Sequence, residues 1–222
     1  MRCGLRSGRE TLARYAGTGL STRAHVTIRW FSCPFAAVEA ALPEGRILDV
    51  GCGHGLLSLR LAATPGREIV AIDPDGSKLA VARQAAAGSP RLISPLTIEE
   101  MAPGHLPDGM IDAAVLNDVL YLMTPERQRR LLGDLVDRLR PGGRLVIKTN
   151  ARSPRWKLAL ATVEEWLATG ALGITRSDGE GLHLCPPDEI AGWLQERGLL
   201  TEGRRIDRWY PWPHYLLVAV KG

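Results

Sequence analysis

The sequence has few cysteines and no long apolar run, and these absences exclude several classes of protein. The four cysteines form neither a C-x-x-C pair nor a Cys/His cluster at zinc-ligand spacing; they are Cys3, Cys33, Cys52 and Cys185. This distribution argues against a disulfide scaffold, predicts no metal site and favours reduced thiols in the cytoplasm. The longest apolar run, near 216–220, falls far short of the roughly 18–20 residues of a transmembrane helix. The basic N-terminus also lacks the apolar stretch of a secretory signal.

Lysine is scarce as well, because arginine supplies 24 of the 28 basic side chains. Before Cys33 the chain carries six arginines against a single acidic residue, Glu10. Such an arm is compatible with contact to phosphate, to an anionic substrate or to a membrane surface, and more commonly with a solvated face. The net charge of +4 is mild, so charge alone identifies no partner.

Neither an internal repeat nor a low-complexity segment is present, and short β-rich runs alternate with runs at helical spacing. This alternation predicts parallel βαβ units and an α/β fold. Strands are expected at 46–50, 69–72, 91–94, 111–116, 145–147, 204–208 and 214–220. Helices are expected at 34–43, 56–63, 77–87, 128–139, 155–167 and 187–197, with a cap at Gly88, a turn at 141–143 and a glycine-rich loop at 170–181. The count indicates a mostly parallel seven-stranded sheet that ends in a hairpin.

A glycine-rich turn and an acidic residue mark a nucleoside site at the carboxyl ends of the first two strands. Gly51, Gly53 and Gly55 allow the backbone to pass close to a ligand, and the helix that follows directs free N–H groups to the same place. Asp73 ends the second strand, where it can accept both hydroxyls of a ribose. A dinucleotide is disfavoured, because the third glycine of its fingerprint would fall on Leu56.

Three segments resemble the class I S-adenosylmethionine (SAM) dependent methyltransferases, in the order and spacing of that family. Residues 47–55 (ILDVGCGHG) resemble motif I, residues 112–120 (DAAVLNDVL) the motif IV region, and residues 139–145 (LRPGGRL) the turn and strand after it. The resemblance implies a doubly wound α/β fold with strand order 3-2-1-4-5-7-6, the last strand antiparallel and helices on both faces. It also implies SAM as methyl donor and S-adenosylhomocysteine (SAH) as product.

The resemblance further implies a single methyltransferase domain over 1–222. Its parts would be a helical, basic cap (1–45), a cofactor-binding core (46–150), a substrate lid (151–185) and a closing helix with hairpin (186–222). By the same resemblance the cofactor site consists of Asp49, Gly51, Cys52, Gly53, Asp73, Pro74, Ile98 and Asn117. Asp49 would orient the amino group of SAM, and Pro74 would flank the adenine. Thr97-Ile98 aligns with an Asp-Ala or Asp-Ile pair on the loop after the third strand, so the exocyclic amine would lose a charged acceptor.

The expected reaction is in-line transfer of the methyl group to a small-molecule or lipid-like acceptor. Among polar residues near the edge of the sheet, Tyr121 and His183 are the candidate general bases, and Asp118 and Lys148 are further possibilities. One alternative is a ribosomal RNA 2′-O-methyltransferase, in which Asp118 and Lys148 would fill the middle of a Lys-Asp-Lys-Glu tetrad. No lysine precedes residue 78 to complete that tetrad. Another alternative is a SAM-binding module without catalysis.

Nucleic acid is a less favoured partner for two reasons. The segment 117–120 reads Asn-Asp-Val-Leu and lacks the [DN]-P-P-[YF] motif of enzymes that methylate exocyclic base amines. Basic and aromatic residues interleave at 204–212, which is compatible with base stacking, but such a pattern along a hairpin more often packs against a sheet. The sequence leaves the oligomeric state open.

Overall fold

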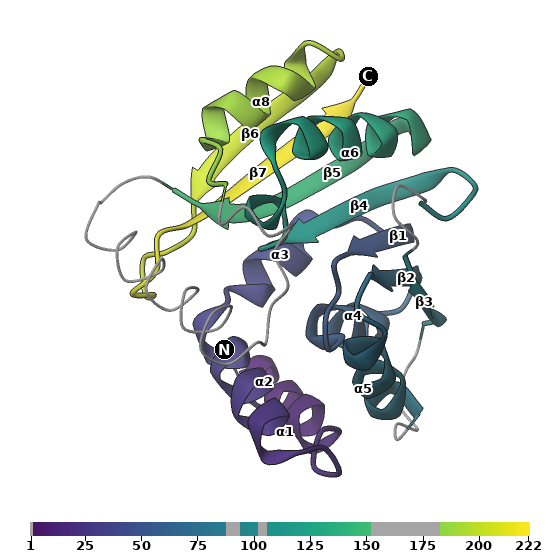
Figure 1. Cartoon of the computed structure of the whole chain (residues 1–222), viewed down its shortest axis with the longest axis vertical. Helices are drawn as coiled ribbons and strands as arrows, with labels where there is room; N and C mark the ends of the chain where they lie inside the picture. The colour runs from purple at the N-terminus through teal and green to yellow at the C-terminus, as the bar shows by residue number, and fades with distance from the viewer. Residues whose placement is uncertain (1, 88–93, 102–105, 152–182) are drawn as a thin grey trace. The chain divides into compact units, whose positions relative to one another are not determined.

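The computed structural model describes residues 2–87, 94–101, 106–151 and 183–222, with side chains from Gly8 onward (Figure 1). The expected helix at 155–167, the loop at 170–181, the cap at Gly88 and most of the expected lid lie outside the described residues. The chain divides into two compact units, 1–114 and 115–222.

The first unit contains three N-terminal helices followed by alternating strands and helices. These are α1 (Arg2–Ala13), α2 (Leu20–Ser32), α3 (Phe35–Ala41), β1 (Gly45–Val50), α4 (Leu56–Ala62), β2 (Arg67–Asp73), α5 (Gly76–Ala87), β3 (Leu96–Glu100) and the start of β4 (Ile111–Asn117). The second unit contains η1 (Leu120–Leu122), α6 (Pro125–Arg138), β5 (Leu139–Asn150), α8 (Pro187–Gln195), β6 (Leu199–Arg205) and β7 (His214–Lys221).

The strands form one seven-stranded sheet in the order β3-β2-β1-β4-β5-β7-β6, which confirms the expected topology. β1, β2 and β3 pair in parallel, and β7 runs antiparallel to both β5 and β6. Val50 pairs with Ile72, and Asp73 pairs with Glu100, so the carboxyl ends of β1, β2 and β3 lie together. That shared edge is where a parallel sheet binds its ligands.

The core of the first unit lies around β1 and β2, whose residues are mostly buried. Ile47 and Ile69 are completely buried, as expected for parallel strands that are covered on both faces. Six of the seven residues of α4 are buried, because this short helix packs against β2 as well as α1. The turn between β1 and α4 is therefore held by two rigid neighbours.

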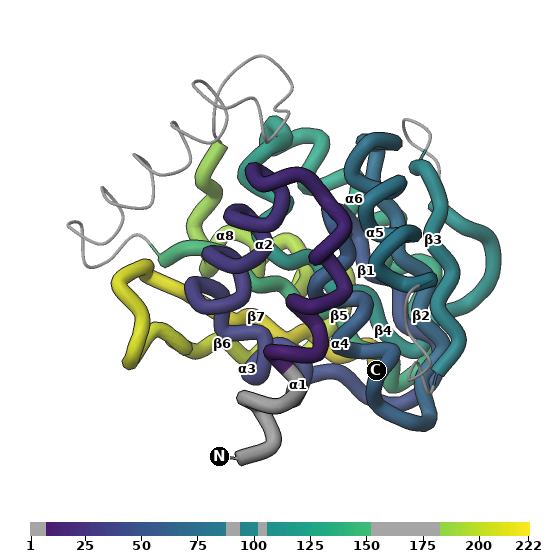
Figure 2. Tube along the Cα trace, turned by 90° about the horizontal axis from the view of Figure 1, so that it is seen from below, coloured from purple at the N-terminus to yellow at the C-terminus, as the bar shows by residue number. Residues whose placement is uncertain are grey.

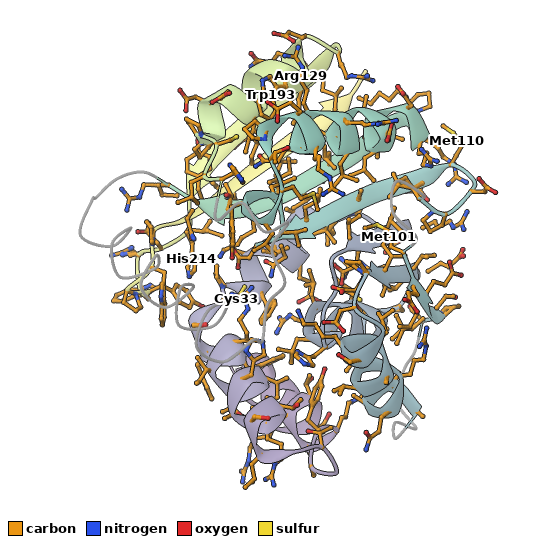
Figure 3. All side chains as sticks on the ribbon, viewed as in Figure 1. Cys33, Met101, Met110, Arg129, Trp193 and His214 are labelled. Atoms are coloured by element: carbon orange, nitrogen blue, oxygen red, sulfur yellow. The ribbon has the colours of Figure 1, made fainter. Side chains whose placement is uncertain are left out.

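In the second unit, α6 and α8 pack against each other beside β5, β6 and β7 (Figure 1). Arg129 of α6 forms an ion pair with Glu196, the residue after α8, and Figure 3 labels Arg129 and Trp193 at this packing of the two helices. Lys221 of β7 donates to the carbonyl groups of Val136 and Leu139, which ties the end of the chain to α6.

Three expected strands differ from the observed ones. β3 covers 96–100, whereas 91–93 of the expected strand lie outside the described residues. Ser94 lies before β3 and donates to the carbonyl of Thr64 (2.6 Å). β6 begins at Leu199 instead of 204. Both are edge strands with exposed polar side chains, so their apolar pattern is weak. β5 continues through the expected turn at 141–143, where Gly142 adopts φ 75° and bends the strand without ending it.

Candidate active site

The turn after β1 is built from glycines in a conformation that other residues rarely adopt. Gly51, Gly53 and Gly55 have φ angles of 72°, 53° and 80°. The N–H groups of Gly51 and Cys52 both donate to the carbonyl of Ile72 (2.8 and 3.0 Å), which fixes the turn to the end of β2. Apart from Gly53 and its two chain neighbours, no heavy atom of the described residues lies within 4 Å of the position that a Cβ of Gly53 would take. The backbone there is open to a ligand.

Asp73 is held in place by the backbone at both of its carboxylate oxygens. Oδ2 accepts the N–H of Gly53 and Oδ1 accepts the N–H of Asp75, each at 2.8 Å. A carboxylate oxygen has two lone pairs, so each retains one for a ligand. Asp75 in turn accepts the N–H and hydroxyl of Ser77 (3.0 and 2.5 Å) and caps α5. The expected ribose acceptor is thus preorganised at the ends of β1 and β2.

Asp49 lies beneath this turn and is 1% exposed. Burial raises the pKa of its carboxyl to about 7, although the hydroxyl of Ser58, 2.6 Å away, opposes the shift, and the charge of Asp73 adds to it. Burial also raises the pKa of the Cys52 thiol, and the two carboxylates raise it further. Cys52 therefore remains protonated and is unsuited to act as a nucleophile.

The structure changes the expected adenine end of the site. Pro74 is exposed and follows Asp73 directly, as expected. The placement of Ile98 on the loop after the third strand is wrong: Ile98 is half-buried within β3 and pairs with Ala71. An acidic residue lies nearby, because Glu100 ends β3 opposite Asp73. Its carboxylate oxygen would lie 3.2 Å from a Cβ at Gly76.

Sequence reasoning missed Glu100 because it placed β3 too early. Met101, labelled in Figure 3, follows Glu100 directly, and its N–H donates to the carbonyl of Asp73 (3.1 Å). The backbone directly after Glu100 is therefore hydrogen-bonded to Asp73 across the ends of β3 and β2. The two consecutive acids Glu99 and Glu100 were the signal that could have revealed this residue. Neighbouring residues of a strand face opposite sides of the sheet, so one of the two acids must lie on each side.

The turn between α1 and α2, and α2 itself, contact the glycine-rich turn at its one histidine. The hydroxyl of the buried Tyr15 donates to the carbonyl of His54 (2.7 Å), and the rings of His25 and His54 lie 5.1 Å apart. Burial lowers the pKa of His25 to about 4, with smaller contributions from His54, Arg29 and Lys78. The pKa of His54 is lowered as well, mainly by burial. Both rings are neutral at physiological pH, so His25 and His54 contact each other as uncharged rings.

In the second unit, β4 ends at the half-buried Asn117, and the next residue forms a buried ion pair. The ammonium of Lys148 lies 2.5 and 2.6 Å from the two carboxylate oxygens of Asp118, and both side chains are at most 3% exposed. Asp118 adopts φ 62°, the only non-glycine residue in the described part of the chain with positive φ. Both carboxylate oxygens of Asp118 are thus engaged by Lys148.

The two candidate bases, Tyr121 and His183, are brought together by a main-chain hydrogen bond. The N–H of His183 donates to the carbonyl of Tyr121 (2.8 Å). Gln128, a completely buried residue that sequence reasoning overlooked, donates from Nε2 to the carbonyls of His183 and Met123 (3.0 and 2.9 Å). The Nε2 atom of His183 is buried and has no hydrogen-bond partner within the described ranges. An imidazole nitrogen in this situation can accept a proton.

The basic and aromatic residues near the C-terminus mostly contact one another. Arg205 forms an ion pair with Asp207 (2.5 Å), and Arg208 lies over the ring of Trp209 (5.0 Å). Tyr210 and Trp212 pack against His214, which Figure 3 labels. Within the described part of the chain, no three His, Cys, Asp or Glu side chains are grouped as a metal site would require.

Among the helices that the structure describes, none combines the length and apolar character needed to span a membrane.

Comparison with known proteins identifies relatives that cover most of the chain. A model of the methyltransferase domain family matches residues 47–143. The ubiquinone biosynthesis O-methyltransferase of Xanthomonas campestris pv. campestris is 32% identical over 185 residues, which cover 80% of this chain and 72% of the relative.

Two solved structures share the fold at lower identity. Magnesium protoporphyrin IX methyltransferase from Synechocystis, with bound SAH, has a TM-score of 0.65 and 20% identity, and the match covers 97% of this chain and 95% of that one. An O-methyltransferase family protein from Burkholderia thailandensis has a TM-score of 0.69 and 20% identity. That match covers 94% of this chain and 62% of the Burkholderia protein.

Proposed function

Since the chain belongs to the class I SAM-dependent methyltransferases, we propose that it methylates a hydroxyl oxygen on a small, apolar acceptor. The methyl donor is SAM and the acceptor class is a small molecule. The choice of oxygen rests on the similarity to the Xanthomonas O-methyltransferase, which extends well beyond the cofactor-binding segment. Ubiquinone, in the name of that relative, carries a long apolar chain on its ring. We therefore favour a phenolic hydroxyl on a lipid-like molecule, methylated in the cytoplasm.

The residues at the carboxyl ends of β1, β2 and β3 fit the three parts of SAM. In our proposal the carboxylate of Asp73 accepts the ribose hydroxyls, and Glu100 accepts the exocyclic amine of adenine. Gly51 and Gly53 run beneath the methionine part, with Asp49 facing its ammonium group and Asn117 near the sulfur. SAM supplies a methyl group on a positively charged sulfur with a good leaving group. The protein mainly holds the acceptor oxygen in line, and such positioning is worth roughly 7–11 kcal/mol.

We propose His183 as the base that takes the proton of the acceptor hydroxyl. Its buried Nε2 lacks a partner within the described residues, and Gln128 and Tyr121 hold its backbone. An imidazole nitrogen is a common general base in such a transfer. Tyr121 then acts as a positioning residue through its carbonyl, and its side chain packs in the interior, where it is 6% exposed.

The test is a labelling experiment with methyl-labelled SAM and a panel of acceptors. The panel contains phenols and catechols with and without an apolar chain, aliphatic alcohols, amines and RNA. We expect label in the phenols and catechols, and more in those with an apolar chain. Label in RNA would instead support the RNA enzyme. SAH binding without any labelled product, from the panel or from a cell extract, would support a non-catalytic module.

The variant His183→Asn tests the base. We expect kcat to fall by about 10²–10⁴-fold, the usual contribution of a general base, with SAH affinity unchanged. The dependence of kcat on pH should also change in this variant. His214→Asn is the matched control, because His214 is a buried histidine that packs on Tyr210 and Trp212. The control should lower stability and leave the pH profile intact; equal profiles in both variants would remove His183 from the reaction.

The affinity for SAH should rise with pH and level off near the pKa of Asp49. Burial raises that pKa to about 7 without ligand. An ammonium group beside Asp49 favours the ionised carboxylate, so binding below pH 7 must release a proton. We expect the affinity to change by up to about tenfold per pH unit between about pH 5.5 and 7, measured by titration calorimetry. His25 stays neutral in this range, because its pKa is about 4.

The variant Asp49→Asn should make the affinity nearly independent of pH over the same range. The pKa of Asp49 is higher in the folded protein than its ordinary value of 3.8, so ionisation of Asp49 costs stability. The free protein should therefore become less stable as the pH rises from 3.8 to about 7. An unaltered pH dependence in the variant would mean that Asp49 does not face the ammonium group.

A further inference from the structure

The helix α2 exposes an apolar stripe that the cofactor site does not use. Leu20, Ile28 and Phe31 are 80%, 55% and 65% exposed, and Ala24 between them is exposed as well. Residues at spacings of four, four and three lie on one face of a helix. These four residues, which we call the α2 stripe, therefore form a continuous apolar surface.

The opposite face of α2 is occupied by the protein itself. Val26 is 1% exposed, His25 contacts the ring of His54, and the ring of Trp30 lies 5.9 Å from that of Phe35. α1 and α2 lie side by side in both views (Figures 1 and 2), and the two helices are in contact. α2 is thus fixed on the first unit by one face, and the α2 stripe points away from that contact.

The basic charge of the protein is concentrated on the same segment. Residues 1–33 carry six arginines against one acidic residue, whereas the other 189 residues carry 22 basic and 23 acidic side chains. Arg23 and Thr27, which are one turn apart on α2, are exposed on the flank of the α2 stripe. Arg9 is exposed on α1. The net positive charge of the chain therefore comes from residues 1–33, the segment that contains the α2 stripe.

We propose that the α2 stripe docks on a membrane surface that contains anionic phospholipids. An apolar helix face inserts to the depth of the headgroups while flanking arginines contact lipid phosphates, and the two contributions add. A second copy of the chain is a poorer occupant, because a symmetric contact would bring two basic segments together. Docking leaves the protein on one side of the membrane and requires no spanning helix.

Vesicle sedimentation tests this proposal on the full chain, with phosphatidylcholine alone and with about one quarter phosphatidylglycerol. We expect the anionic vesicles to bind the protein at least about tenfold better. Raising the salt from about 0.05 to 0.5 M should weaken binding, since the Debye length shortens. Leu20→Gln, Ile28→Gln and Phe31→Gln combined should lower binding about tenfold or more, because the apolar contribution is lost. SAH affinity in this variant should equal that of the wild type.

Two controls make the outcome decisive. Leu200→Gln changes another exposed leucine, 76% exposed on β6, and should leave vesicle binding unchanged. Arg9→Gln with Arg23→Gln should lower binding to anionic vesicles and leave binding to phosphatidylcholine unchanged. The proposal is overturned by equal binding of wild type and stripe variant, or by no preference for anionic vesicles. A dimer in solution that the stripe variant abolishes, without vesicle binding, would assign the stripe to a second copy. Vesicle binding needs no methyl acceptor, so it succeeds or fails independently of the proposed function.

Discussion

Replacing Lys148 by methionine is expected to lower the free energy of unfolding by about 3–5 kcal/mol. The methionine fills similar volume but leaves the carboxylate of Asp118, 3% exposed, without its counter-ion. A buried charge without a partner costs more than the pair contributes. The backbone adds to the effect, because the N–H of Asp118 donates to the carbonyl of Lys148 while Asp118 holds φ 62°. Denaturant unfolding of wild type and variant measures the difference.

An exposed ion pair supplies the control for this measurement. Arg197 and Asp137 lie 2.9 Å apart with side chains 46% and 68% exposed, so Arg197→Met should cost at most about 1 kcal/mol. Adding Asp118→Asn to Lys148→Met should recover part of the loss, since the buried charge that lost its counter-ion Lys148 is then removed. If Lys148→Met costs no more than the exposed control, the Asp118–Lys148 pair does not stabilise the loop after β4.

Replacing Asp73 by asparagine is expected to lower the affinity for SAH by about 100-fold. The proposed ribose contacts are hydrogen bonds to a charged group, each worth about 1.5–3 kcal/mol, and roughly 2.7 kcal/mol corresponds to 100-fold. Asparagine also places an NH₂ group against the N–H of Gly53 or Asp75, where Asp73 has two acceptors. The NH₂ group then faces a backbone N–H group, and the turn loses a hydrogen bond even without ligand. Titration calorimetry with SAH measures the loss.

Asp75→Ser is the matched control for Asp73→Asn. Asp75 accepts hydrogen bonds from Ser77 and caps α5, and serine retains the ability to cap. The control should leave SAH affinity within about threefold of the wild type, which is less than 1 kcal/mol. A similar threefold change in Asp73→Asn would show that Asp73 serves the turn alone and not a ribose.

The sequence by itself determined the cofactor half of the molecule, because its signals are local. Glycines 51, 53 and 55 are needed where φ is positive, and strands of apolar residues place Asp49 and Asp73 at one edge of a parallel sheet. The order of the sheet followed from the family resemblance and was confirmed. These features depend on residues that are close in sequence or on the ends of adjacent strands.

Only the tertiary structure decided the features that join distant residues or lie on weakly patterned strands. Glu100 was missed because β3 is an edge strand, whose exposed polar residues leave little apolar periodicity to detect. The pairing of Asp118 with Lys148 and the support of His183 by Gln128 join residues 30 and 55 positions apart. The sequence likewise did not predict the α2 stripe or its exposure. Whether an apolar face is covered depends on what the folded chain places against it, and no local pattern contains that information.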